Sequence, residues 1–117
     1  MKRIAILRCL RSNDVCTGAG CMQAFNKKQG AFAAYGDEPL ELLAYWSCNG
    51  CADCRLQNQQ GIEEKLERII RLQPDAVHVG VCSKHRNARG EMITCKVIAG
   101  LCGRLRSAGI AVVEGTH

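Results

Sequence analysis

Four short apolar runs, separated by segments with helical periodicity, constrain the fold of this chain more than any other feature. The runs span residues 3–8, 40–46, 75–81 and 110–113. Their length and their polar or turn-forming flanks are typical of strands in a buried sheet. Alternation of strands with helices predicts a parallel sheet, because each crossover helix returns the chain to the starting edge.

The segments between the runs predict three helices. Periodic apolar residues favour a first helix over residues 21–32, which Gly36 would end, and a second over 62–70 that stops before Pro74. A third is expected from a candidate N-cap at Thr94 to residue 108. We therefore expect one α/β domain over residues 1–117. It would have three α/β/α layers around a four-stranded parallel sheet of flavodoxin-like order 2-1-3-4.

Composition and charge remove several classes of function. The net charge is +5, with basic and acidic residues interleaved on the predicted helices, and aromatic residues make up only 4%. Without stacking aromatics or a recognisable fingerprint, nucleic-acid binding is not expected. No apolar run approaches the roughly 20 residues of a membrane span. The first run ends at Arg8, too early for a signal peptide, so we expect a cytoplasmic protein with no membrane partner.

Nine cysteines are a high count for a chain of 117 residues. The odd number and the lack of an export signal argue against a disulfide framework. In a reducing compartment, clustered thiols indicate metal binding or redox chemistry. Three of them form the sequence Cys48-x2-Cys51-x2-Cys54, directly after the second apolar run, with Gly50 available for a tight turn.

Potential metal ligands follow every predicted strand. Cys9 follows the first strand, Cys48 and Cys51 the second, Cys82 the third and His117 the fourth. The carboxyl ends of parallel strands meet at one edge of a sheet, where ligands bind in folds of this type. Thiolate and imidazole suit Zn²⁺ or iron–sulfur centres rather than Mg²⁺ or Ca²⁺. The sequence thus predicts a cysteine-rich metal site at this edge.

Other cysteines and histidines divide between ligands and core residues. Cys16 and Cys95 stand at predicted helix starts, where a thiolate is stabilised, and both are candidate ligands. Cys102 on the apolar stripe of the third helix and His78 inside a strand are interpreted as core residues. For Cys21, Cys54 and His85 the sequence leaves core, surface and ligand roles open.

A basic segment follows Cys82 and contains Lys84, Arg86 and Arg89. A solvated loop is the simplest interpretation of these charges. Two alternatives are that they offset the negative charge of a multi-thiolate site or hold a small anionic ligand beside it.

The chain resembles the CGGC-domain proteins, a family of small proteins for which metal binding is suggested. The resemblance covers essentially the whole chain. Its motifs are Leu7-Arg8-Cys9, Cys16-Thr17-Gly18, Cys48-Asn49-Gly50-Cys51, Cys82, Cys95 and the closing Glu114-Gly115-Thr116-His117.

Two positions depart from the family pattern. Asn49 replaces the first signature glycine, which a turn tolerates because Asn also enters left-handed conformations. Val97 stands where the family often has a histidine, so a histidine ligand is excluded there. The resemblance implies metal binding and suggests zinc, but it supplies no reaction.

Three functions remain open from the sequence. The first is a metal-binding protein, with zinc slightly ahead of an iron–sulfur cluster, using Cys9, Cys16, Cys48, Cys51, Cys82, Cys95 and His117. The second is a thiol–disulfide oxidoreductase in which Cys48 attacks and Cys51 resolves. The third is a metal-dependent enzyme with an open coordination position. The sequence decides neither whether the protein is an enzyme nor its oligomeric state.

Overall fold

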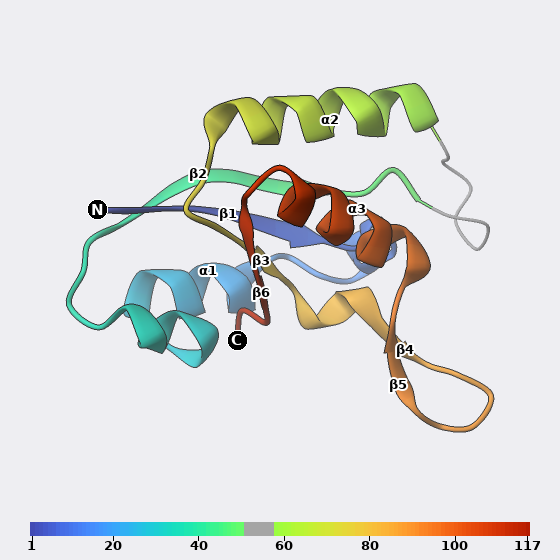
Figure 1. The fold of residues 1–117 in the computed structure, drawn as a ribbon. Coiled ribbons are helices and arrows are strands. Elements are labelled where there is room, and N and C mark those ends of the chain that lie inside the picture. Colours follow the sequence, from blue (N-terminus) through green and yellow to red (C-terminus); the bar gives the residue numbers. More distant parts are fainter. Residues whose placement is uncertain (51–57) are drawn as a thin grey trace.

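The computed structural model of the protein, described over residues 1–50 and 58–117, has a four-stranded parallel sheet at its centre (Figure 1). The strands are β1 (Lys2–Arg8), β2 (Leu40–Ser47), β3 (Ala76–Val79) and β6 (Ala111–Glu114), in the spatial order β2-β1-β3-β6. The predicted α/β class and parallel sheet are confirmed. The predicted order 2-1-3-4 counted only four strands. The fourth parallel strand is labelled β6 because a small hairpin precedes it.

Three helices cover the two faces of this sheet. They are α1 (Ala19–Lys27) on one face, and α2 (Gln59–Leu72) and α3 (Lys96–Ser107) on the other (Figure 1). Strand β1 shows why. Ala5 and Leu7 are fully buried in the core beneath α2 and α3, whereas Ile4 and Ile6 are fully buried beneath α1. Alternate residues of a central strand therefore supply two separate cores, as the pleat requires.

The first predicted helix is shorter than expected. Helix α1 ends at Lys27, because Lys28 takes a left-handed conformation with φ of 53° and closes the last turn through its backbone N–H. Gly30 has φ of 57°, and residues beyond it form the 3-10 helix η2 (Gly30–Tyr35) instead of further α-helix. Phe32 is still fully buried against the sheet, so the apolar periodicity was real although the helix is broken.

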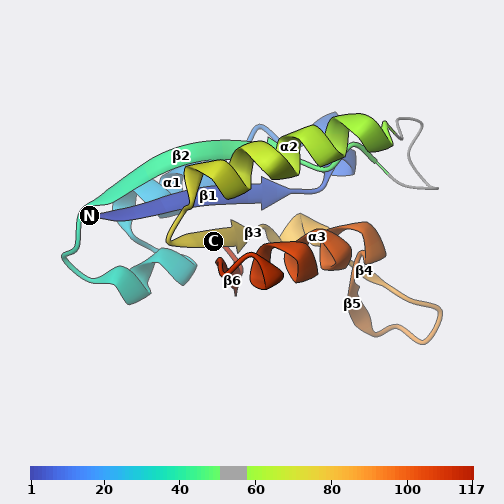
Figure 2. The ribbon, with the colours of Figure 1, turned by 45° about the horizontal axis from the view of Figure 1, so that its top comes forward.

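The predicted basic loop is instead a hairpin. Strand β3 gives way to the 3-10 helix η3 (Val81–Ser83), and β4 (Lys84–Arg86) then pairs antiparallel with β5 (Met92–Thr94). Figure 2 shows the hairpin projecting beyond α3. The Asn87 side chain accepts the backbone N–H groups of Arg89 and Glu91, which fixes the turn. Thr94 therefore lies in a strand, and Cys95 occupies the cap position of α3.

The two helices on one face are joined at their exposed sides. An ion pair links Glu63 of α2 to Arg104 of α3, and it lowers the pKa of the carboxyl and raises that of the guanidinium. Helix α2 starts at Asn58, whose side-chain oxygen accepts the N–H of Gly61 at 2.8 Å. No helix in the described ranges is long and apolar enough to cross a membrane.

Candidate metal centre

Four thiols lie at the carboxyl end of the sheet, on the side of α2 and α3. Cys9 directly follows β1, Cys48 directly follows β2, Cys82 lies in η3 after β3, and Cys95 caps α3. Backbone N–H groups point at two of the sulfurs. That of Cys9 donates to Cys82 Sγ and that of Leu10 to Cys48 Sγ, both at 3.4 Å. Such N–H···S bonds orient a thiol and stabilise its thiolate form.

The thiols are close enough to influence one another. Burial raises the pKa of Cys9 to about 11, a hydrogen bond from the Arg11 backbone opposes this, and the thiols of Cys48, Cys95 and Cys82 raise it further. Cys9 thus keeps its proton at neutral pH in the metal-free protein. A metal ion bound here would have to displace that proton, as metal–thiolate bonding generally does.

The path from solvent to these thiols is lined by basic residues. A cavity of about 330 Å³ is bordered by Cys9, Cys82 and Cys95, together with Arg11 and His85. Lys84 also borders it and pairs with Glu114 at 3.4 Å. Of the predicted basic cluster, Lys84 reaches the cavity wall, whereas Arg86 donates to a carbonyl within its own hairpin.

The donor set has the right chemistry for a soft metal ion, because thiols at a partly buried edge become thiolate ligands of Zn²⁺ or iron. The spacing is looser than a bound ion requires. Within residues 1–50 and 58–117, no three Cys, His, Asp or Glu side chains are arranged to hold a metal ion as they stand. Metal binding therefore needs the thiols to approach one another.

The segment that carries Cys48 is fastened to α2 by a polar clamp. Lys65 Nζ donates to Ser47 O at 3.0 Å and to Asn49 Oδ1 at 2.7 Å. Asn49 Nδ2 in turn donates to Asn58 O at 3.1 Å, so both flanks of Cys48 are held against the start of α2. A Cβ on Gly61 would lie 2.7 Å from Asn49 Nδ2, so glycine is needed for this approach.

Two of the predicted ligands, Cys16 and His117, lie apart from this group. Cys16 is exposed on the α1 side, where its Sγ accepts the N–H of Gly18 at 3.3 Å. His117 is also exposed, and its ring lies over Gly20 of α1, 3.0 Å from where a Cβ would stand. Cys51, like Cys54, falls outside the described residues. Within residues 1–50 and 58–117, the thiols that gather are Cys9, Cys48, Cys82 and Cys95.

The residues interpreted as core have structural partners. His78 is fully buried and stacks on Phe32 with 4.3 Å between ring centroids. Its Nδ1 lies 2.9 Å from Gly115 O and its Nε2 2.7 Å from Tyr35 Oη. Since a carbonyl only accepts, Nδ1 carries the proton and Nε2 accepts from the tyrosine. Burial lowers the pKa of this imidazole.

Two further cysteines are also buried in the packed interior. Cys102 is 6% exposed within the core between α3 and the sheet, and burial raises its pKa. Cys21 is 5% exposed, and its Sγ lies 3.1 Å from Thr116 Oγ1. The sequence interpretation of Cys102 is confirmed, and Cys21 joins the core on the α1 side.

Sequence reasoning missed the clamp, although part of its signal was visible. The sequence indicates Asn49 only as a residue that tolerates a turn, and it does not single out Lys65. An asparagine in place of a signature glycine, followed by Asn58 and Gly61 at the next helix start, was the available clue. Its partners are separated by up to 18 residues, so no local pattern identifies them.

Comparison with known proteins gives one match. No curated protein and no solved structure matches the chain significantly. The family model described as the CGGC domain matches residues 3–117, which is nearly the whole sequence and includes all four gathered thiols. The chain therefore belongs to the CGGC-domain family.

Proposed function

We propose that this protein binds a metal ion at the carboxyl edge of its sheet, and that the ion is zinc. The observation that carries the proposal is the approach of four thiols from separate parts of the chain. Cys82 and Cys95 border one cavity with Cys9, and Cys48 Sγ accepts the N–H of the neighbouring Leu10. Membership of a family for which metal binding is suggested supports it. Four thiolates around Zn²⁺ form a closed tetrahedral site, the usual arrangement of structural zinc.

The surroundings of the thiols support a metal site over a chance cluster. Peptide N–H groups already donate to Cys48 and Cys82, and such donors balance the negative charge of metal-bound thiolates. The cation of Lys65, fixed by the clamp beside Cys48, adds positive charge on one side. Arg11 and Lys84, which border the cavity, do the same there.

A thiol–disulfide oxidoreductase is less well supported. Its attacking thiol would be Cys48, which is only 2% exposed and receives a backbone hydrogen bond. A substrate disulfide must reach the attacking sulfur in line, and burial of this kind prevents that approach. We therefore place the oxidoreductase behind both the zinc and the iron–sulfur versions of the metal site.

Anaerobic purification followed by elemental analysis and a visible spectrum tests the proposal. We expect one zinc per chain and no absorbance near 400 nm. Stoichiometric iron with a broad band in that region would replace zinc by an iron–sulfur cluster. Protein that binds neither metal after reduction and reconstitution would refute metal binding altogether.

The fourth ligand can be assigned by a matched pair of variants. The sequence predicts both Cys51 and Cys95 as ligands, and Cys95 borders the same cavity as Cys9 and Cys82. If Cys95 is the ligand, Cys95→Ser lowers zinc affinity by roughly a hundredfold or more, and Cys51→Ser changes it little. The reverse result would transfer the fourth position to Cys51.

A further inference from the structure

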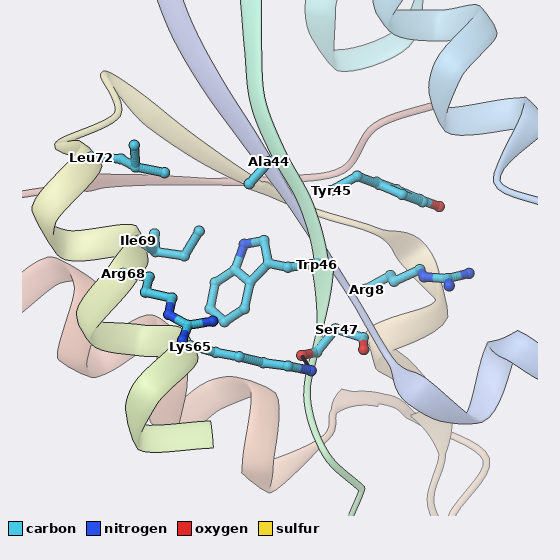
Figure 3. A pocket seen from close by; sticks show the side chains of 9 residues that line it. All are labelled: Arg8, Ala44, Tyr45, Trp46, Ser47, Lys65, Arg68, Ile69 and Leu72. Carbon is cyan, nitrogen blue, oxygen red and sulfur yellow. Dashed lines mark hydrogen bonds between the residues drawn. The ribbon is translucent and has the colours of Figure 1, made fainter. Parts of the chain in front are cut away.

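A second cavity lies away from the thiols, between the outer strand β2 and helix α2. Its volume is about 340 Å³, within the range of small-molecule sites. Strand β2 is an edge strand with β1 on one side only. In Figure 3 the indole of Trp46 lies between β2 and α2 and forms one wall of the cavity. Ala44 and Ile69 lie beside it and Leu72 at one end.

The charges around this cavity all have one sign. Its charged lining residues are Arg8, Lys65 and Arg68, and no carboxylate is among the lining residues. Two of these cations already have partners. Arg8 donates to Asn13 Oδ1 at 2.7 Å and lies over the Tyr45 ring, and Lys65 belongs to the clamp. Arg68 has no hydrogen-bond or ion-pair partner among the described residues, and Figure 3 shows its guanidinium beside Trp46.

A buried donor without a partner marks the inner wall. Trp46 is 8% exposed, and its indole N–H meets no acceptor within the described part of the chain. Leaving a buried N–H unsatisfied costs about 1–3 kcal/mol, so such groups are uncommon unless something else supplies the acceptor. Figure 3 shows the indole nitrogen at the end of the ring toward Ala44 and the guanidinium of Arg68 beside the opposite end, so a ligand oxygen held by Arg68 would accept this N–H only after the indole turns over.

We infer that the cavity binds a small organic carboxylate with an apolar body. The carboxylate pairs with Arg68, whose planar guanidinium matches two carboxylate oxygens. The body lies along the apolar side chains Ala44, Ile69 and Leu72. Leu72 is 39% exposed beside the cavity, and such a body would cover it. The inference is independent of the metal site.

The single tryptophan of the chain makes the test direct, because every indole signal comes from Trp46. The probes are octanoate, 1-octanol and octylammonium, which share a tail and differ in head-group charge. Each is titrated below its micelle concentration against the full chain, followed by fluorescence and by the indole ¹H–¹⁵N resonance. We expect saturable binding of octanoate with a downfield shift of the indole proton, and binding at least tenfold weaker for the other two.

Two arginines of α2 provide the matched variants. Arg68→Gln should weaken octanoate binding by about tenfold, whereas Arg71→Gln, the same charge change on an exposed residue outside the cavity, should leave it unchanged. Equal binding of octanoate and octanol would contradict the inference, as would equal losses in both variants. An indole resonance that stays fixed while octanoate binds would also overturn it.

Discussion

The hydrogen bonding of buried polar groups differs between the interior beneath α1 and the carboxyl edge of the sheet. Beneath α1, the ring nitrogens of His78 are bonded to Tyr35 and Gly115, and Cys21 meets Thr116. At the carboxyl edge toward α2 and α3, four thiols gather. Among the described residues, the sulfurs of Cys48 and Cys82 accept backbone N–H groups and have no side-chain hydrogen-bond partner. Buried polar groups whose hydrogen bonds are all made stabilise a fold. A cluster of potential metal ligands that lacks a bound partner instead indicates a binding site.

The largest expected effect is a loss of zinc affinity when one of the four carboxyl-edge thiols is replaced. Cys48→Ser should lower zinc affinity by roughly a hundredfold or more, because a metal ligand is lost. Cys102→Ser is the matched control, since Cys102 is a core thiol outside the gathered group. Competition with a chromophoric zinc chelator measures both affinities. Equal losses in the two variants would mean that the location of a thiol in the fold does not determine its role.

The next effect concerns the hydrogen-bonded His78 beneath α1 and should appear in the free energy of unfolding alone. Tyr35→Phe leaves the buried Nε2 of His78 without a donor and should cost about 1–3 kcal/mol in the free energy of unfolding. Urea unfolding of the metal-free protein measures this. Tyr45→Phe is the control, because the Tyr45 hydroxyl is buried without a hydrogen-bond partner among the described residues. A loss of zinc affinity in Tyr35→Phe would show that the two faces are not independent.

The clamp holds the segment around Cys48 against α2, so variants of the clamp test whether α2 positions this thiol. Gly61→Ala adds a Cβ that would lie 2.7 Å from Asn49 Nδ2 and should displace the Asn49 side chain. Alanine favours helix by about 1 kcal/mol, but the Cβ would also lie 3.0 Å from Asn58 Cγ and disturb an N-cap of similar value. Stability should therefore change little while zinc affinity falls about tenfold. Asn49→Gly removes the same side chain and should give the same loss. Unchanged affinity in both variants, with wild-type binding intact, would assign the clamp a purely structural role.

The smallest effect is a pH dependence from His78. Burial lowers its pKa in the folded state, against the opposing hydrogen bond to Gly115, while the unfolded chain titrates near pH 6.5. Below about pH 6.5 the unfolded state therefore binds a proton on His78 more readily than the folded state does. The contribution to stability is present above about pH 6.5 and is lost as the pH falls, by at most about 1.4 kcal/mol per unit.

Urea unfolding of the metal-free protein between pH 7 and 5.5 measures this slope. His78→Phe keeps the stacking on Phe32 and removes the titrating group. The variant should be less stable overall but show a flatter pH profile than the wild type. A profile as steep as that of the wild type would assign the effect to other groups.

Sequence periodicity predicted the sheet because each strand carries its own signal. Short apolar runs give β1, β2, β3 and β6, and strand–helix alternation makes them parallel. Element ends were less predictable. Gly30 in the first helix was visible, but the left-handed Lys28 that ends α1 is a residue of good helix propensity. The hairpin β4–β5 depends on an Asn87 turn within a segment dominated by charge.

The candidate site was predictable for a different reason. Ligands after parallel strands must meet at one edge, so Cys9, Cys48 and Cys82 could be grouped before their contacts were known. Cys95 came from its helix-start position, and the structure brings it to the same cavity. Cys16 precedes α1 and His117 follows β6, yet both lie on the α1 side of the sheet. Chain order alone does not say to which face a loop turns.

X-ray absorption at the zinc edge tests the central claim, that four thiols close on one ion, most directly. The measurement uses the full chain, purified without oxygen and loaded with one equivalent of zinc. We predict a first shell of four sulfur atoms at about 2.3 Å and no light-atom ligand. A shell that includes nitrogen or oxygen at about 2.0–2.2 Å would contradict an all-thiolate site and bring a residue such as His85 or His117 back as a ligand.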